Sequence, residues 1–177
     1  MSNPEAYKKR INNFWYYYKV PTIIFLLVFA AGIYLFLTHR QSVESDYDVA
    51  IVSPRGCSAE QLEKLRAALE QAGQDQNGDG QVIVTVHLYR FALGQDGQDA
   101  KEVAGLDADL VGKMSGIFFT EDPVKFEAST NGICKASDAV PVSEIPLLTG
   151  CGIDDLYLLI RADADEKYAS LRSALNN

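Results

Sequence analysis

The chain has 177 residues, 47% of them hydrophobic and 23% charged, and its formal net charge is −8 at pH 7. This length suits one domain of ordinary size, and the apolar content excludes a wholly disordered chain. The negative charge argues against nucleic acid as a partner, because phosphate binding needs clustered Lys and Arg. The charge is also unevenly distributed. Residues 1–19 hold four Lys and Arg against one Glu, whereas residues 41–177 hold 11 Lys and Arg against 23 Asp and Glu.

Residues 20–38, VPTIIFLLVFAAGIYLFLT, contain no charge. As a helix they would span about 28 Å, the thickness of a bilayer's hydrocarbon core. Basic residues precede this run and acidic residues follow it, so the positive-inside rule predicts its orientation. We expect residues 1–19 to form a cytoplasmic tail, basic and rich in aromatics, and residues 20–38 to be a single-pass, uncleaved signal anchor in the cell membrane. Residues 41–177 are then extracytoplasmic. A cleaved signal peptide is the alternative, but apolar residues continue past the small residues 30–32.

After a polar tether at 39–46, residues 47–177 alternate between strand-like and helix-like patterns. Runs rich in β-branched and aromatic residues predict strands at 47–53, 81–91, 116–120 and 156–161. Apolar residues at helical spacing, together with capping residues, predict helices at 58–72, 99–114, 124–128 and 163–175. Residues 129–152 contain prolines and glycines and carry no clear pattern.

Strands that alternate with helices are typical of βαβ units, in which helices connect parallel strands. Continuous apolar runs, such as those in the strands at 116–120 and 156–161, are typical of strands buried on both faces. The sequence therefore predicts an α/β domain at 47–177, preceded by one N-terminal transmembrane helix. Its sheet is expected to be mainly parallel, with four or slightly more strands and with helices on both faces.

Residues 75–80 match the first half of an EF-hand calcium loop, D-x-N-x-D-G. In such a loop positions 1, 3 and 5 supply side-chain oxygens and position 7 supplies its carbonyl. The Glu expected at position 12 is replaced here by Val86. The motif predicts weak binding of Ca2+, the only cofactor indicated, by Asp75, Asn77, Asp79 and Gln81. The alternative is a turn without a metal ion, in which the Asn-Gly and Asp-Gly pairs only allow the backbone to reverse direction.

Three cysteines, Cys57, Cys134 and Cys151, are an odd number for an oxidising location. A Cys134–Cys151 disulfide would close a loop of about 18 residues and stabilise the domain by roughly 3 kcal/mol. It would hold together the segment with the least regular pattern. Three reduced thiols are the alternative, and no CxxC motif suggests zinc.

Val84, Val86 and Tyr89 form a strand of the VxVxxY kind, and Phe118–Thr120 end a later strand in FFT. With these motifs, the order of segments resembles one lobe of a periplasmic-type solute-binding protein. With its aromatic-rich anchor and NGDG loop, the chain also resembles small single-span membrane-anchored proteins of Gram-positive bacteria. A complete solute-binding protein needs two lobes, and this chain has room for one, so the resemblance implies no ligand residues.

No catalytic set is evident, since neither His39 nor His87 has a Ser, Cys or carboxylate at a suitable spacing. The leading hypothesis is therefore a non-enzymatic interaction domain that binds another protein, in a role accessory to a membrane transporter. One alternative is an enzyme whose site is built from loops at the C-terminal strand ends, around Ser53, Cys57, Thr120 and Asp122. Another is a module that binds a small solute or calcium.

Overall fold

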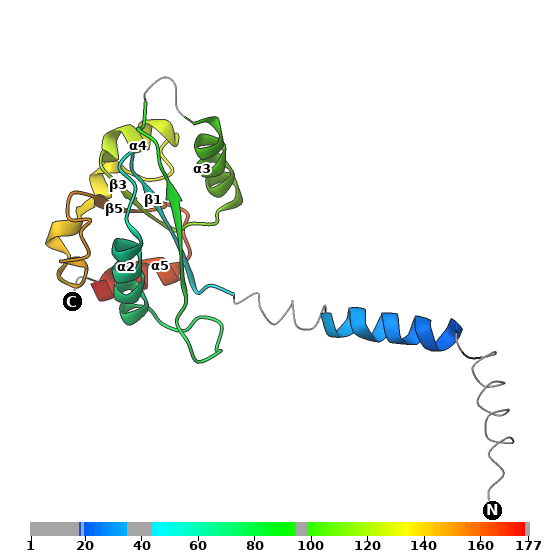
Figure 1. The fold of residues 1–177 in the computed structure, drawn as a ribbon. Helices are drawn as coiled ribbons and strands as arrows, with labels where there is room; N and C mark the ends of the chain where they lie inside the picture. The colour runs from blue at the N-terminus through cyan, green and yellow to red at the C-terminus, as the bar shows by residue number, and fades with distance from the viewer. Residues whose placement is uncertain (1–17, 19, 35–43, 95–98, 176–177) are drawn as a thin grey trace, which may run out of the picture. The chain divides into compact units, whose positions relative to one another are not determined.

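A computed structural model describes residues 18, 20–34, 44–94 and 99–175 (Figure 1). The chain divides into two compact units, residues 1–43 and residues 44–177.

In the first unit, residues 20–34 are helical, and their large apolar side chains are 46–70% exposed. The structure describes only part of the predicted transmembrane helix, because residues 35–38 lie outside the described residues. The same holds for residues 1–17 and 19 of the predicted tail and for residues 39–43 of the tether. In the described part of the chain, none of the helices combines the length and the apolar character needed to cross a membrane.

The second unit is an α/β domain. Its strands are β1 (Tyr47–Val52), β2 (Val84–Tyr89), β3 (Ile117–Thr120), β4 (Val140–Pro141) and β5 (Tyr157–Ile160). Its helices are α2 (Ala59–Ala72), α3 (Ala100–Gly112), α4 (Pro123–Ser129) and α5 (Glu166–Leu175). Three short 3-10 turns occupy parts of the segment 136–148, for which the sequence carried no clear pattern.

The five strands form one mixed sheet in the order β2-β1-β3-β5-β4, which corrects the expectation of a mainly parallel sheet. β2, β1 and β3 are parallel, but β5 runs antiparallel to β3, and β4 runs antiparallel to β5. For two successive strands to be parallel, the chain must return to the end of the sheet at which the first strand began. Here Thr120, at the end of β3, pairs with Tyr157, at the start of β5, so the chain re-enters the sheet from the edge at which it left.

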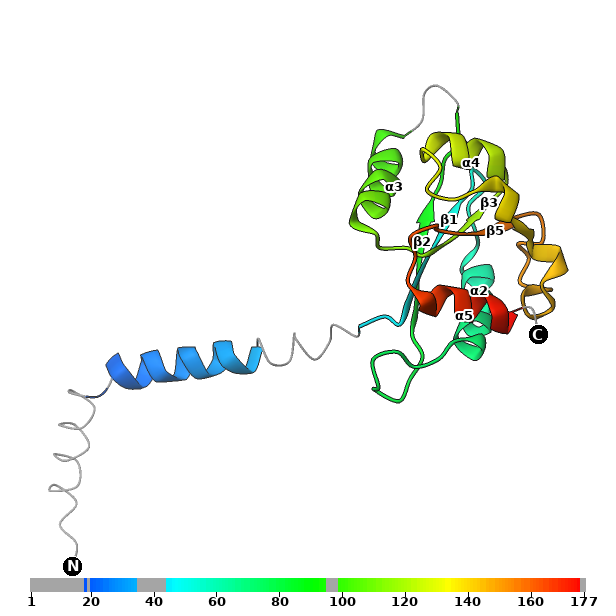
Figure 2. The same ribbon diagram turned by 180° about the vertical axis from the view of Figure 1, so that it is seen from behind.

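Helices cover both faces of the sheet, as the sequence predicts (Figure 1 and Figure 2). Side chains alternate between the two faces of each strand and belong to two separate hydrophobic clusters. On one face, Val49, Ile51 and Phe119 pack with residues of α2 and α5. On the other face, Ala50 and Phe118 pack with residues of α3 and α4.

Local sequence explains where the helices begin. Ser58 caps α2 and forms a capping box with Gln61, as the spacing predicts. Asp99 accepts a hydrogen bond from the backbone N–H of Lys101 at the start of α3. The strand predicted at 81–91 is shorter in the structure, since β2 covers only Val84–Tyr89.

Candidate functional site

Open α/β sheets hold their ligands at the carboxyl edge of the parallel strands. From β1 the chain passes through α2 to β2 on one side, and from β2 through α3 to β3 on the other side of β1. The carboxyl ends of β1 and β3 therefore flank the point where the strand order reverses, at which open α/β sheets bind ligands. The residues that follow these two strands are Ser53 and Glu121.

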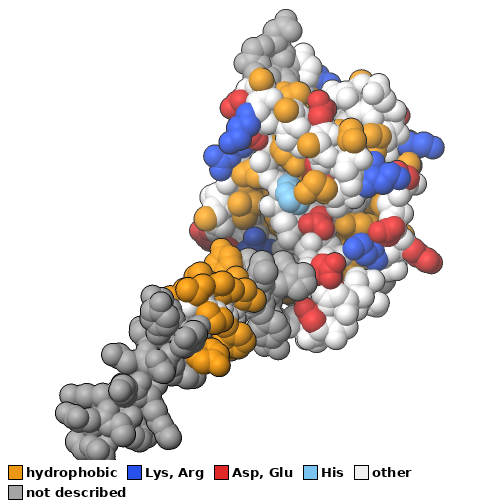
Figure 3. All heavy atoms as spheres, turned by 90° about the vertical axis from the view of Figure 1, so that its right-hand side faces the viewer, with side chains coloured by type: hydrophobic (Ala, Val, Ile, Leu, Met, Phe, Trp, Pro, Cys, Tyr) orange, Lys and Arg blue, Asp and Glu red, His pale blue; other side chains and the backbone are white. Residues whose placement is uncertain are grey.

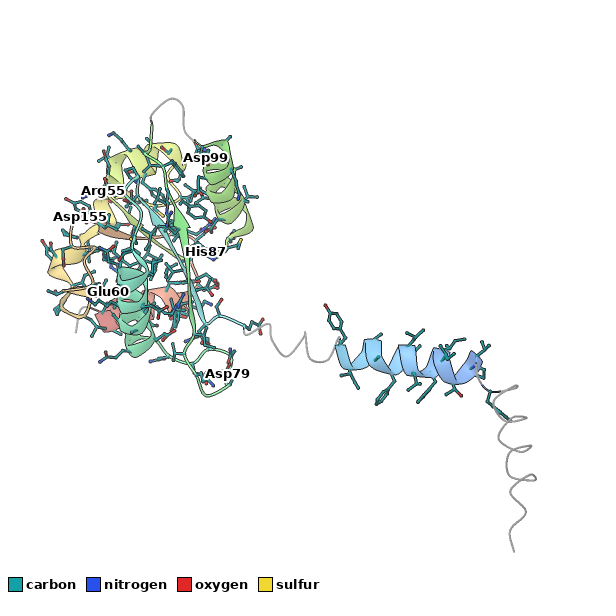
Figure 4. All side chains as sticks on the ribbon, in the orientation of Figure 1. Arg55, Glu60, Asp79, His87, Asp99 and Asp155 are labelled. Carbon is teal, nitrogen blue, oxygen red and sulfur yellow. The ribbon has the colours of Figure 1, made fainter. Side chains whose placement is uncertain are left out.

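Arg55 bridges two carboxylates at this edge. Its Nε donates to Glu121 Oε1 at 3.1 Å, and its Nη2 donates to Asp155 (Figure 4). Ser53 Oγ donates to the same Glu121 oxygen at 2.6 Å. The Arg55 side chain is 67% exposed, so water screens both ion pairs and each is weak. Together they link the loop after β1, the loop after β3 and the segment before β5.

Two small cavities flank the Arg55 bridge. One, of about 230 Å³, lies between Cys57, Gln61 and Gly152. The other, of about 160 Å³, is lined by Phe91, Thr120 and Lys125. Pockets for drug-sized ligands usually measure about 300–1,000 Å³. Both cavities at the carboxyl edge are smaller than this range.

The structure brings Ser53, Cys57 and Thr120 to this edge, as the enzyme alternative expects, but none is set up as a nucleophile. Ser53 is only 2% exposed, and its hydroxyl group donates its hydrogen bond to Glu121. Burial, followed by the charge of Asp155, raises the pKa of the Cys57 thiol, whereas reactive cysteines have a lowered pKa. Thr120 is buried, and its Oγ1 has no hydrogen-bond partner among the described residues.

Asp122, the fourth residue of the enzyme alternative, caps the N-terminus of α4. Its Oδ1 accepts from the backbone N–H of Lys125 at 3.0 Å, and its Oδ2 pairs with Lys125 Nζ at 3.2 Å. The backbone hydrogen bond, then the side-chain bond to the same lysine, lowers the pKa of the Asp122 carboxyl. The residue is therefore a helix cap.

Sequence reasoning missed Arg55, Glu121 and Asp155. The first two follow predicted strands within three residues, so their place at the carboxyl edge was available from the pattern. Asp155 carried no such signal, because it reaches the edge only through the antiparallel direction of β5.

The predicted calcium loop is an ordered turn between α2 and β2. Asp75 accepts from the backbone N–H groups of Gly78 and Gly80, at 2.7 and 2.8 Å. Asp79 Oδ1 accepts from the N–H of Gln81 at 2.8 Å, and Asn77 Oδ1 accepts from the N–H of Asp79 at the same distance. The side-chain oxygens named by the motif thus already bind backbone groups of their own loop. Position 12, Val86, lies in β2.

Asp46, which the motif does not include, holds this loop against the sheet. Its carboxylate is buried and accepts from the backbone N–H groups of Ile83, Gln76 and Asn77, at 2.8, 2.7 and 3.2 Å. Burial by itself would raise the pKa of Asp46, but the three N–H donors outweigh it and lower the pKa. Within the described ranges, no three His, Cys, Asp or Glu side chains are grouped so that they could hold a metal ion.

All three cysteines are free thiols, so the disulfide suggested between Cys134 and Cys151 is absent from the structure. The reason is their placement, since Cys134 belongs to the cluster under α3 and α4 and Cys151 to the cluster under α2 and α5. The sheet separates these clusters. Burial raises the pKa of Cys134 to about 12, and burial also raises that of Cys151.

A larger cavity, of about 330 Å³, lies at the opposite edge, where β3 starts and β5 ends. Six charged side chains line it, and three of them bind one another. Asp163 accepts from Arg161 Nε at 2.5 Å and pairs with Lys113 Nζ at 2.7 Å. Lys113, then Arg161, lowers the pKa of Asp163 to about 2. Arg161 Nη1 is buried beside this cavity and has no hydrogen-bond partner among the described residues.

Comparisons of the chain with protein-family models, with curated proteins and with solved structures found no match.

Proposed function

We propose that this chain is a single-pass membrane-anchored protein whose extracytoplasmic α/β domain binds another protein and is not an enzyme. In this proposal residues 20–38 cross the bilayer, residues 1–19 lie in the cytoplasm and residues 41–177 lie outside. The resemblance to one lobe of a solute-binding protein favours a partner at a membrane transporter, where the domain acts as an accessory.

Two features support the anchor. The run at 20–38 is uncharged, and the helical residues 20–34 expose large apolar side chains all round. Such side chains need an apolar environment, which lipid supplies. The charge difference between residues 1–19 and residues 41–177 supports the orientation.

The Arg55 bridge is the main observation in support of the proposal that the domain is not an enzyme. At the edge where an α/β enzyme holds its substrate, Arg55 links Glu121 and Asp155 between two small cavities. Ser53 is buried and Cys57 has a raised pKa, so neither supports nucleophilic catalysis. A protein partner is favoured over a small ligand because binding a protein requires no deep pocket.

Labelling of intact cells tests the topology. We expect a cysteine introduced as Asn176→Cys to react with a membrane-impermeant maleimide and one introduced as Asn3→Cys to be protected until the cells are lysed. The background is a chain in which the native cysteines are replaced by Ser or Ala, so that only the new thiol is read. Labelling at position 3 together with protection at position 176 would reverse the proposed orientation.

Calcium binding by the loop 75–81 is a second candidate function. It is favoured by the side-chain oxygens of Asp75, Asn77 and Asp79, which all turn into one short loop. Each carboxylate oxygen that accepts one N–H keeps a further lone pair for a cation. Extracellular calcium modules bind with millimolar affinity, which an incomplete loop could supply.

For the fragment 44–177, we expect 10 mM Ca2+ to add about 1.4 kcal/mol to the free energy of unfolding if the dissociation constant is near 1 mM. The melting temperature should then rise by roughly 3–6 °C. Asp79→Ala should abolish this rise, and it should also lower the melting temperature slightly without calcium, because Gln81 loses its acceptor. Equal shifts with Ca2+ and Mg2+ at matched ionic strength, or none, would mean that the loop is only a turn.

A further inference from the structure

β2 is an edge strand of the sheet formed by the described residues. In the strand order β2 has β1 on one side, and no other described strand pairs with it. The structure therefore leaves one side of the Val84–Tyr89 backbone without a strand partner within the described residues.

The register shows which backbone groups face outward. The carbonyl oxygens of Ile83 and Tyr89 accept from the N–H groups of Tyr47 and Ser53, at 3.3 and 3.1 Å. Hydrogen bonding between parallel strands repeats every second residue, so Thr85 and His87 also face β1. The N–H and C=O groups of the residues between them, Val86 and Leu88, then point away from β1.

This part of the edge is accessible. Val84 is buried, but each residue from Thr85 to Tyr89 is half-buried. The strand VTVHLY also lacks Lys and Pro, two of the residues by which natural edge strands avoid unwanted pairing. An edge of this kind is suited to strand addition, in which an extended segment of a partner extends the sheet through main-chain hydrogen bonds.

The net negative charge of residues 41–177, with 23 Asp and Glu against 11 Lys and Arg, indicates a basic partner. On the side of α3, His87 Nε2 lies 3.5 Å from Asp48 Oδ1. At the C-terminal end of the strand, Glu102 accepts from the backbone N–H of Arg90 at 3.1 Å. The loop with Asp75 and Asp79 precedes the strand, and the exposed Arg90 follows it. Figure 3 shows apolar side chains around the histidine and both acidic and basic side chains on this face, and Figure 4 labels His87.

We propose that the outer edge of β2 binds an extended basic segment of a partner protein by strand addition. This proposal deepens the protein-binding function proposed above and rests on it. The segment forms hydrogen bonds to the backbone of Val86 and Leu88. Its apolar side chains lie beside those of Val86 and Leu88, and its Lys or Arg side chains lie on the His87 side, near Asp48. A second copy of this chain is a poorer occupant, since residues 41–177 carry 12 more acidic than basic residues.

Amide hydrogen exchange of the full chain in detergent micelles tests this inference. Without a partner, the amides of Val86 and Leu88 should exchange faster than those of Thr85, His87 and Tyr89, which are bonded to β1. The probe is a capped peptide in which Val and Lys alternate. Saturation with it should slow exchange at Val86 and Leu88 at least tenfold, while a peptide in which Val and Glu alternate should leave both rates unchanged.

Val86→Pro provides the matched variant. Proline removes the outward N–H without removing a hydrogen bond to β1, and edge strands tolerate it at such positions. We expect at least tenfold weaker binding of the basic probe, whereas Val86→Thr, which keeps the N–H, should bind like the wild type. Slow exchange at Thr85 and His87 in the proline variant would verify that β2 still pairs with β1.

Three results would overturn the proposal. The first is unchanged exchange at Val86 and Leu88 with saturating basic probe. The second is equal binding of that probe by the Val86→Pro and Val86→Thr variants, which would indicate charge attraction alone. The third is protection of Val86 and Leu88 in the free protein together with a dimeric mass, where Val86→Pro abolishes both the dimer and the protection of Leu88, because a second copy would then occupy the edge. The measurement in micelles does not depend on the orientation of the chain in the cell. It can therefore refute strand addition while the labelling experiment supports the topology, and the labelling experiment can refute the topology while strand addition is supported.

Discussion

Asp109→Ala is expected to destabilise the domain by about 3–4 kcal/mol. Asp109 lies in α3 and is fully buried. Its Oδ1 accepts from the backbone N–H of Ser115 at 2.7 Å, and its Oδ2 accepts from Ser115 Oγ and Tyr89 OH, at 2.7 and 2.9 Å. Alanine would leave all three donors without their acceptor inside the protein, and each such loss costs roughly 1–3 kcal/mol where water does not replace it.

Urea denaturation of the fragment 44–177, followed by circular dichroism, measures this loss. Asp109→Asn should cost clearly less, because its carbonyl oxygen can still accept from the Ser115 N–H and its amide can donate to the two hydroxyl groups. Asp107→Ala is the control, since Asp107 is exposed on the same helix, and it should change the free energy of unfolding by less than about 0.5 kcal/mol. A loss below about 1 kcal/mol for Asp109→Ala would contradict the buried network.

Gly116→Ala is expected to cost about 1–3 kcal/mol by overpacking. Gly116 directly precedes β3, where its N–H donates to the Asp48 carbonyl and its carbonyl accepts from the Arg161 N–H, each at 3.1 Å. A Cβ at this position would lie 2.3–2.4 Å from the ring of Tyr168. Neither partner can move freely, because the backbone of Gly116 is held on both sides and the Tyr168 ring is buried in the core.

Double-mutant analysis separates this clash from other causes. Tyr168→Leu removes the ring, so adding Gly116→Ala to it should cost less than adding Gly116→Ala to the wild type, with a coupling energy of about 1 kcal/mol or more. Gly112→Ala is the matched control. Its Cβ would meet only Met114 at an ordinary 3.5 Å, and alanine favours the helix. Equal costs of Gly116→Ala with and without the Tyr168 ring would refute the steric explanation.

Much of the fold could be predicted because its signals are local. The capping box at Ser58 and Gln61 uses residues three apart, and the helix that follows places Leu65 and Leu69 on one buried face. The apolar runs of β1 and β3 identify buried strands whatever their partners are, since strands covered on both faces lack alternation. These features depend on the character and spacing of neighbouring residues.

The direction of β5 is a different kind of property. An apolar run such as YLLI predicts a buried strand equally well in either direction, and the direction depends on which edge the preceding segment reaches. The segment 121–156 combines one short helix, 3-10 turns and the two-residue strand β4, and it has no periodic sequence pattern from which its path could be predicted. The expectation of a mainly parallel sheet failed at this point.

Four features follow from the order of the residues alone: the uncharged run at 20–38, the charge difference on its two sides, the α/β class of residues 47–177 and the composition of the loop 75–81. Three others depend on how the chain folds: Asp155 joins Arg55 and Glu121, the sheet separates Cys134 from Cys151, and β2 is an edge strand. The two groups differ in range, because composition and capping act over a few residues, whereas ion pairs across loops, the face on which a thiol lies and the order of strands depend on contacts between segments far apart in the chain.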